Sequence, residues 1–360
     1  MVGMKKRLQI EGHELNVHGS SQRETGISSR ATGSVTLDDV AKLAGVSPIT
    51  VSRAVNQPGK VAAKTLEKVN QAIARTGYVP NLLAGGLASR RSRLIAAIIP
   101  SVSNSVYAET TCFFSERLRD SGYQVVLGES GFDEEQEESL ISAILSRRPD
   151  GIFLTGINHS ATCRRILMGA NIPVVETWDL TPTPLDTVIG FSHQRVGEAV
   201  AEYLLLKGYQ RIGIVSATDH RAQIRQKAFL ETLTKKGMTD VAISVVPVPN
   251  SFKLGREGLA DLLDKGFTGG AVFFSSDTLA QGGLAEAQSR GLAIPEDLAL
   301  VGFGDQPYAA YTFPALTTVK FDRKAIGMRA AEILLEKMNG DYQQENVIDV
   351  GFSIIERQTA

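Results

Sequence analysis

The segment from Leu37 to Asn56 contains the side chains whose types and spacing have the clearest chemical potential in the chain. Arg53 can donate two parallel hydrogen bonds to the edge of a guanine. Ser47 and Thr50 would lie at the start of a helix, where hydroxyl and backbone N–H groups hold phosphates. The segment is therefore predicted to read DNA, and the alternative is a small helical hairpin with a solvated polar face.

The same segment has the pattern of two short helices joined by a tight turn. Gly45 can adopt the left-handed conformation that ends the first helix, and Ser47 followed by Pro48 is typical of a helix start. On the second helix, Val51 and Val55 have the i, i+4 spacing of a core-facing pair. The outward-facing candidates to enter a groove of DNA are then Pro48, Ile49, Ser52, Arg53 and Asn56.

The composition is that of an ordinary globular protein, because 43% of the 360 residues are apolar and 21% are charged. This length suits two or three domains. The two cysteines, Cys112 and Cys163, cannot form a disulfide framework or a zinc cage alone, which favours a reducing compartment. No apolar stretch approaches the ~18 residues of a membrane span, and the N-terminus lacks a secretory signal, so we expect a cytoplasmic protein.

Charge is distributed unevenly along the chain. Residues 1–93 contain 14 Lys and Arg against 6 Asp and Glu, a net charge of +8, and the remainder carries −9. A basic head on an acidic body favours nucleic acid at one end, although charge alone equally describes a solvated surface. Within the head, residues 1–34 lack any helical or strand periodicity and are predicted to be a disordered leader.

From residue 94 onward, short β-rich runs alternate with longer amphipathic segments, which is the pattern of a parallel α/β sheet. The alternation continues for about 265 residues, more than one doubly wound sheet usually needs. We therefore expect two lobes with doubly wound parallel sheets and a ligand cleft between them. The predicted strands are 94–100, 123–128, 151–155, 173–176, 187–191, 211–216, 271–275 and 298–303.

A two-lobed enzyme is the alternative for such a layout, but the sequence lacks the motifs that would support it. There is no Gly-x-Gly-x-x-Gly after a strand, no phosphate loop and no nucleophile elbow. The five histidines form no metal or nucleophile motif; they are His13, His18, His159, His193 and His220. We therefore expect no catalytic residue, no metal and no cofactor.

Two runs in the head, Val35–Ala41 and Gly77–Asn81, resemble the DNA-binding head of the lactose-repressor (LacI) family. The resemblance extends to about residue 357 through Gly190–His193, Ser275–Asp277, Val301–Asp305 and Pro314–Val319. It implies a helix-turn-helix domain at 35–80, a hinge at 81–93 and a body at 94–360 that binds an effector and dimerises. It also implies that a homodimer, or a larger homo-oligomer, places each second helix in the major groove of a near-palindromic operator.

The resemblance assigns DNA contacts to the head and the hinge; they are Leu37, Ser47, Pro48, Ile49, Thr50, Ser52, Arg53, Asn56, Tyr78, Asn81, Ala84 and Leu87. Pro48 and Ile49 have no side-chain hydrogen bonds to offer bases, which shifts specificity toward other positions. In related repressors a hinge leucine wedges into the minor groove, and Leu87 matches it. Because Gly85 and Gly86 disfavour an isolated helix, we expect the hinge to order only on DNA; a flexible tether is the alternative.

The body resembles periplasmic sugar-binding proteins, which close two lobes around a ligand. We expect one lobe from 94–191 with 322–336, and a second from 192–321 with the chain end. The predicted effector contacts are Ser103, Asn104, Tyr107, Thr155, Trp178, Arg225, Asn250, Ser276, Asp277, Phe303 and Asp305. The alternatives are core packing for Trp178, a helix N-cap for Asp277 and a surface position for Arg225.

Three segments resemble the gluconate-operon repressor branch: Glu176–Pro182, Gly190–His193 and Asp349–Ser353. Many relatives have aspartate where this chain has Gly304, and removing a carboxylate suits an acidic ligand. We therefore expect gluconate, a keto-gluconate or a phosphogluconate, paired with Arg225 and helped by Arg221 or Lys227. The alternatives are another sugar, a purine-type corepressor and an exported solute-binding protein.

Overall fold

The computed structural model describes residues 35–79 and 91–360. These belong to two units, which we name the head (35–79) and the body (91–360). The predicted leader and the predicted hinge contacts Asn81, Ala84 and Leu87 lie outside the described residues. No helix within the described ranges has the length and hydropathy needed to cross a membrane.

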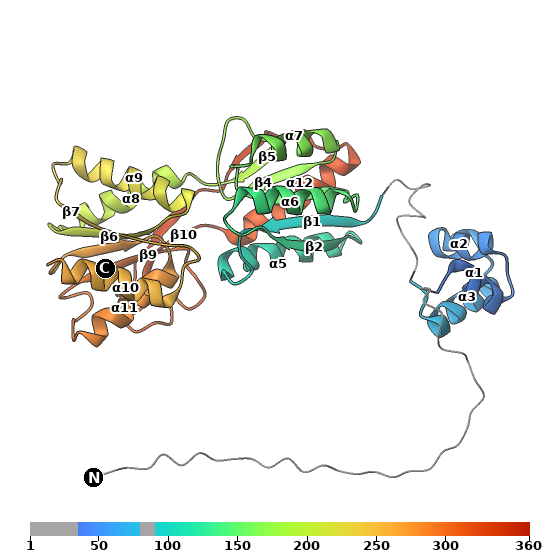
Figure 1. Ribbon diagram of the computed structural model, residues 1–360, viewed down its shortest axis with the longest axis horizontal. Helices are drawn as coiled ribbons and strands as arrows, with labels where there is room; N and C mark the ends of the chain where they lie inside the picture. Colours follow the sequence, from blue (N-terminus) through green and yellow to red (C-terminus); the bar gives the residue numbers. More distant parts are fainter. Residues whose placement is uncertain (1–34, 80–90) are drawn as a thin grey trace, which may run out of the picture. The chain divides into compact units, whose positions relative to one another are not determined.

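The head consists of three α-helices and one short 3₁₀ helix, and the first two α-helices are the pair that the sequence pattern predicts (Figure 1). Ser47 accepts the N–H of Thr50 at the start of the second helix, and Gly45 ends the first helix at φ 67°. Thr36 and Asp39 exchange hydrogen bonds in a capping box at the first helix. The elements are α1 (Leu37–Ala44), α2 (Pro48–Asn56), η1 (Pro58–Lys60) and α3 (Ala63–Thr76).

Small and β-branched side chains fill the core of the head; they are Val40, Ala41, Val51, Ala54, Val69 and Ala72. Val51 is fully buried as expected, but its predicted partner Val55 is only half-buried, and Ala54 occupies the core instead. In a helix with 3.6 residues per turn, positions i+3 and i+4 flank the same face, and packing decides which is central. The small Ala54 allows close packing of the short helices.

The body contains two six-stranded sheets, each parallel except at one edge strand of the second sheet. The first sheet has the order β11-β5-β4-β3-β1-β2 and the second β12-β10-β9-β8-β6-β7. The strands of the first are β1 (Leu94–Ile99), β2 (Gln124–Glu129), β3 (Gly151–Thr155), β4 (Val174–Thr177), β5 (Thr187–Gly190) and β11 (Val347–Asp349). Those of the second are β6 (Ile212–Ala217), β7 (Val241–Val246), β8 (Ala271–Phe274), β9 (Ala299–Phe303), β10 (Thr317–Lys320) and β12 (Ser353–Ile355).

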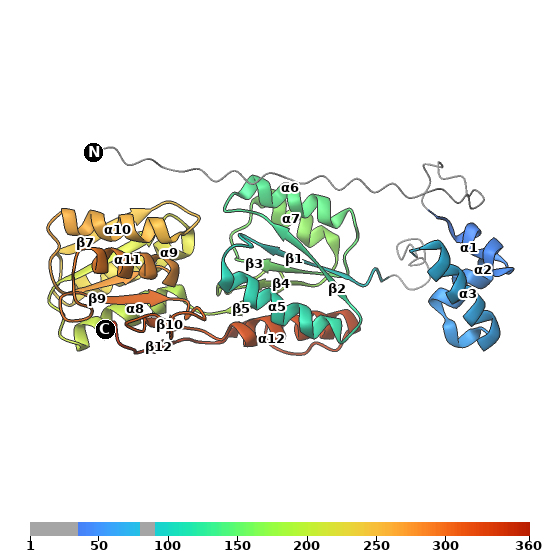
Figure 2. The ribbon, with the colours of Figure 1, turned by 90° about the horizontal axis from the view of Figure 1, so that it is seen from below.

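Helices cover both faces of each sheet, so each lobe has three layers. Figure 2 shows α6 and α7 on one face of the first sheet and α5 and α12 on the other. In the second lobe α8 packs against α9, and α10 against α11. The helices are α5 (Ser105–Arg119), α6 (Glu134–Leu145), α7 (Ala161–Ala170), α8 (His193–Leu206), α9 (His220–Lys235), α10 (Phe252–Asp264), α11 (Asp277–Ser289) and α12 (Arg323–Asn339).

The chain crosses between the lobes three times, after β5, after β10 and after β11. The predicted return of the chain to the N-terminal lobe at 322–336 is therefore too short, because β11 still pairs with β5 at Val347–Asp349. At the entrance to the body, Asp150 accepts the backbone N–H groups of Ser92 and Arg93. These two residues, which the sequence places in the linker, are thus held by the body.

Candidate functional site

The body encloses a cavity of about 120 Å³ between its two lobes. It is lined by segments at or after the ends of β1, β2, β4, β5, β6, β7, β8 and β9, because parallel strands bring their carboxyl ends to one edge of each sheet. Eight of the eleven predicted effector contacts line it: Ser103, Asn104, Tyr107, Trp178, Arg225, Asn250, Ser276 and Phe303. Thr155, Asp277 and Asp305 lie elsewhere.

Arg225, in the second turn of α9, is a buried charge on the cavity wall, which Asp219 and Arg221 also line. The residue is only 4% exposed, and its guanidinium lies 3.9 Å from the centre of the Phe303 ring. Its Nη1 donates to His193 Nδ1 at 2.8 Å and its Nη2 to the carbonyl of Ser275 at 3.0 Å. Within the described part of the chain, no carboxylate lies within ion-pair distance of this guanidinium. Burial lowers the pKa of Arg225 to about 10, so it remains a cation at neutral pH.

His193, at the start of α8, is held in its neutral form beside Arg225. Burial, followed by the charges of Arg225 and Arg221, lowers its pKa well below the usual range. Because Arg225 donates to Nδ1, the proton is on Nε2, which donates to the carbonyl of Trp178 at 2.9 Å. His193 therefore fixes the arginine without neutralising it. The sequence analysis did not assign this histidine a role.

Three buried polar atoms on the cavity wall have no hydrogen-bond partner among the described residues. They are Arg225 Nε, Asn250 Oδ1 and Ser275 Oγ. Buried polar groups are almost always satisfied in proteins, so such a concentration in one place indicates where a bound molecule completes the hydrogen bonds. The three atoms together offer a charged donor, an acceptor and a hydroxyl.

Arg221, one turn before Arg225 on α9, is by contrast already paired. Its Nε donates to Asp179 Oδ2 at 2.7 Å and its Nη1 to the Tyr107 hydroxyl at 3.2 Å. Burial alone would lower the pKa of Arg221, but the Asp179 carboxylate outweighs it and raises that pKa. Asp179 and Tyr107 belong to the N-terminal lobe and Arg221 to the other, so this contact connects the lobes. Lys227, the other proposed helper, points into solvent with 78% of its side chain exposed.

Trp178 combines the two roles that the sequence left open. It is buried, and its ring packs edge-on against Phe321 and Tyr107 with centroids 5.0 and 4.9 Å away, while the residue also lines the cavity. Its backbone has φ 78°, a left-handed conformation that bulky residues rarely adopt. Gly190 permits this path, because a Cβ there would collide with the backbone of Asp179.

Two of the three remaining predicted contacts, Asp277 and Asp305, have structural partners, whereas the Thr155 hydroxyl has none among the described residues. Asp277 is fully buried and accepts hydrogen bonds from Gln306 N and Thr318 Oγ1, and burial raises its pKa to about 6. It is not the N-cap of α11, since Ser276 caps that helix. Asp305 pairs with Arg357 at 2.7 Å. Thr155 lines a neighbouring cavity that also includes Glu137.

Two predicted contacts sit at helix starts. Asn104 caps α5 and Ser276 caps α11, and both line the cavity. The N-terminus of a helix carries a partial positive charge, so both ends favour an anion in the cavity. Gln306, which the sequence analysis missed, lines the cavity as well and accepts a hydrogen bond from Ser105 at 2.8 Å across the lobes.

The head presents an exposed surface on α2. Ile49 is 71% exposed, an unusual state for an isoleucine, and Pro48 and Arg53 beside it are also exposed. Within the described residues Arg53 forms no ion pair, which leaves its guanidinium available. Asn56 instead donates to the Ser52 carbonyl at 2.9 Å. Ser47 and Thr50 lie at the helix start, and their hydroxyls are 2.9 Å apart.

The other two predicted head contacts, Leu37 and Tyr78, are half-buried and pack against the head core. Only part of each side chain is therefore available to another molecule. Tyr78 follows α3 directly, where Gly77 ends the helix with φ 66°.

Comparison with known proteins explains why a helix-turn-helix and a two-lobed cleft occur in one chain. Residues 36–81 match the model of bacterial regulatory proteins of the lacI family, and residues 201–360 match that of the periplasmic binding protein-like domain. The HTH-type transcriptional regulator GntR of Pseudomonas aeruginosa is 38% identical over 92% of this chain and 97% of its own length. The chain belongs to the LacI family. It is a DNA-binding transcriptional regulator, and the LacI resemblance drawn from the sequence is confirmed.

Solved LacI-family structures agree with the fold. A LacI-family transcriptional regulator from Silicibacter pomeroyi superimposes with a TM-score of 0.85 at 35% identity, covering 90% of this chain and 99% of that one. The lac repressor dimer bound to operator and an anti-inducer gives a TM-score of 0.76 at 27% identity, covering 91% and 99%. LacI-family proteins are regulators that bind operator DNA and small-molecule effectors and act as dimers, so this chain is not an enzyme.

Proposed function

We propose that this LacI-family regulator is a repressor whose effector is a sugar acid of the gluconate class, bound in the cavity between the lobes. The observation that carries the proposal is the buried guanidinium of Arg225, which has no carboxylate partner among the described residues. A buried cation without a counter-ion is costly, and a ligand carboxylate or phosphate would remove that cost. The proposal also agrees with the sequence resemblance to the gluconate-operon repressor branch.

The other groups of the cavity suit the remainder of such a ligand. Unpartnered Asn250 Oδ1 and Ser275 Oγ would bond hydroxyl groups of a polyol chain. Trp178, Tyr107 and Phe303 would cover its carbon backbone, since they supply apolar walls to the cavity. A neutral sugar would satisfy the hydroxyl partners and leave Arg225 unpaired. The affinity is therefore expected to depend more on the charge of the ligand than on its length.

Release from DNA would follow from a change in how the lobes close. In the proposed mechanism, a dimer binds a near-palindromic operator through its heads (35–80) and hinges (81–93), and its bodies (94–360) bind the ligand. The ligand would contact residues of both lobes, and a ligand shifts a conformational equilibrium by its differential affinity for the two states. Closure around a sugar acid would thus lower the operator affinity, which is a coupling between two sites.

Calorimetry on the purified full chain tests the ligand class with matched compounds. D-gluconate is the probe, and glucose and gluconamide are neutral controls of nearly the same size. We expect gluconate or a close sugar acid to bind and to weaken operator binding in gel shifts, and the neutral compounds to do neither. Binding of glucose as tight as that of gluconate, or a response to purine bases alone, would refute the sugar-acid proposal.

For the head, we propose that Arg53 reads a base and that Ile49 contacts an apolar base edge, as their exposure on α2 permits. Arg53→Ala is expected to weaken operator binding by about 1–3 kcal/mol. Fluorescence anisotropy at one fixed salt concentration measures this on operator and on random DNA. An equal loss on both would mean that Arg53 contacts phosphate only. Effector binding, measured by calorimetry, should be unchanged.

A further inference from the structure

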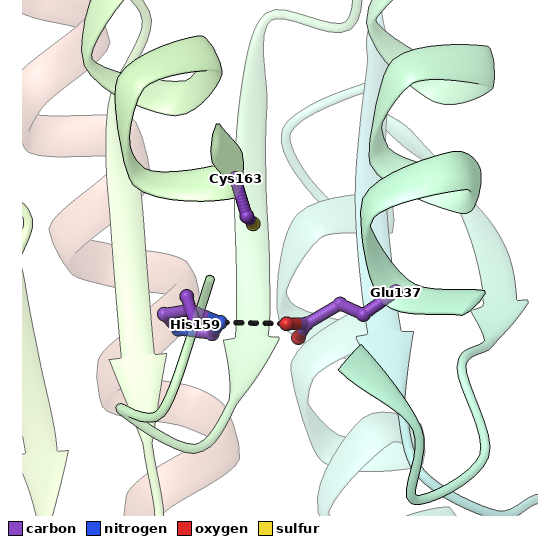
Figure 3. Close-up of side chains that lie close together, drawn as sticks. All are labelled: Glu137, His159 and Cys163. Atoms are coloured by element: carbon purple, nitrogen blue, oxygen red, sulfur yellow. Dashed lines mark hydrogen bonds and ion pairs between the residues drawn. The ribbon is translucent and has the colours of Figure 1, made fainter. Parts of the chain in front are cut away.

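A second cluster of reactive side chains lies in the N-terminal lobe, apart from the cavity of Arg225. Glu137 of α6, His159 of the β3–α7 loop and Cys163 of α7 point toward one another (Figure 3). One donor atom from each, a carboxylate oxygen, a ring nitrogen and the sulfur, lies within 4.8 Å of the other two. The three come from separate elements that the fold brings together.

The donor set has the chemistry of a zinc site. Zn²⁺ accepts thiolate, imidazole and carboxylate ligands, at about 2.3 Å for sulfur and about 2.0–2.2 Å for nitrogen and oxygen. The side chains of Cys163 and His159 are almost completely buried, and that of Glu137 is 12% exposed. Side-chain movements of roughly 1 Å would bring these three donors to such distances. Glu137 also lines the solvent-open cavity of about 340 Å³ beside Thr155, from which water can supply a fourth ligand.

Glu176 of β4 provides the second, independent observation. It is completely buried, and its Oε1 lies 3.5 Å from His159 Nε2, on the ring edge away from Glu137. Neither Glu176 Oε1 nor His159 Nε2 has a hydrogen-bond partner among the described residues, while Glu176 Oε2 accepts the N–H of Leu185. Metal-bound histidines commonly donate their second ring N–H to such a carboxylate, which orients the ring.

We propose that Glu137, His159 through Nδ1, and Cys163 form a binding site for Zn²⁺, with Glu176 as the carboxylate that positions His159. Binding releases the proton of the Cys163 thiol and the Nδ1 proton of His159, because thiolate and neutral imidazole are the ligand forms. The sequence predicts no metal, because its histidines form no recognisable metal-binding motif. The proposal does not depend on the identity of the effector.

The position of the site gives the metal a structural consequence. His159 lies in the loop between β3 and α7, and Gly156 belongs to the same loop. Gly156 packs closely against the Arg221 guanidinium, because a Cβ at Gly156 would be 2.8 Å from Nη2. A metal that fixes His159 to α6 and α7 therefore restrains a loop that touches the Arg221–Asp179 ion pair.

Cobalt substitution tests the site on the untagged full chain. We expect one Co²⁺ per chain with a thiolate-to-cobalt charge-transfer band, displaced by Zn²⁺. Cys163→Ser should abolish the band and raise the Kd for Zn²⁺ at least about 100-fold, because it removes a metal ligand. The matched control Cys112→Ser, which changes the exposed free cysteine, should leave the band and the Kd as in the original chain.

Two further variants keep the test decisive if Cys163→Ser fails to fold. Glu137→Gln removes one ligand at the partly exposed edge of the site and should weaken Zn²⁺ binding. Glu176→Gln should raise the Kd about 10- to 100-fold while the charge-transfer band remains, the result expected of a positioning residue. Three results would each overturn the proposal: no charge-transfer band in the original chain, a band that depends on Cys112, or a Zn²⁺ affinity that Glu137→Gln does not change. The cluster would then be a structural network of ion pairs without a metal.

Discussion

Two buried histidines in the body, His193 and His159, have opposite electrostatic surroundings. His193 lies beside Arg225 and Arg221, and burial together with those charges lowers its pKa. Burial would also lower the pKa of His159, but the neighbouring Cys163, Glu137 and Glu176 side chains outweigh it and raise that pKa to about 11. Burial is common to both, so the neighbouring charges decide the difference.

The comparison also shows what each cluster lacks. The cavity contains an arginine without a counter-ion, and the cluster around His159 contains two carboxylates, a thiol and unpartnered polar atoms. A buried guanidinium without an ion-pair partner favours an anion, and a cluster of carboxylate and thiol donors favours a cation. The proposed sugar acid and the proposed Zn²⁺ thus follow from the same electrostatic argument with opposite signs.

The largest expected effect comes from removing the cation of the cavity. Arg225→Gln should weaken binding of the sugar acid by about 2–5 kcal/mol, because the ligand anion would be buried without a partner. Calorimetry measures the Kd, and operator affinity without ligand should stay near that of the original chain. Lys227→Ala, on the same helix but exposed, is the matched control. Equal affinities for Arg225→Gln and the original chain would end the charge-pairing argument.

A pH effect follows from the lowered pKa of His193. The folded protein keeps His193 neutral, whereas the unfolded chain takes up a proton near pH 6.5, so the contribution of His193 to the free energy of unfolding should fall as the pH falls below 6.5. The contribution is at most about 1.4 kcal/mol per pH unit. Urea unfolding of the ligand-free protein between pH 5 and 7.5 measures it.

His193→Gln should flatten that pH dependence, and His220→Gln, which changes an exposed histidine, should not. The readout is the slope of stability against pH, so a general loss of stability in either variant does not affect the conclusion. An unchanged slope in His193→Gln would show that the histidine is protonated in both states.

The smallest expected effect concerns Asp179, which already neutralises Arg221 across the lobes. Asp179→Asn removes a negative charge near the ligand and frees Arg221, so sugar-acid affinity should rise by about 1 kcal/mol. A phosphogluconate, with more negative charge, should gain more than gluconate. Comparison of both ligands by calorimetry tests this. A loss of affinity for both would mean that the ion pair shapes the cavity more than its charge opposes the ligand.

Sequence reasoning identified the elements that have a local signal. The first two helices of the head and eight of the twelve strands follow from periodicity and from residues such as Gly45 and Ser47. The strands β7, β10, β11 and β12 were missed, partly because only two of the six residues of β7 are buried and β11 and β12 have three residues each. Their pairing depends on partners distant in the chain.

The candidate sites show the same limit. Strand-end positions predicted most of the cavity lining, because parallel topology brings those ends together. The pairing of Arg221 with Asp179, and of His193 with Arg225, had no signal in the local sequence. Glu137 and His159 are 22 positions apart and meet only because α6 lies beside the loop after β3. Such contacts are properties of the packed chain.

The three chain crossings between the lobes limit how the body can move. With one crossing the lobes could turn about several axes, whereas three crossings restrict their relative motion and favour a hinge-like closure. The body is then expected to move mainly by a hinge motion that changes the angle between the two lobes. A molecule that binds in the cavity would act by changing the angle between the lobes. Chemically different ligands would therefore produce the same kind of conformational change and differ only in its extent.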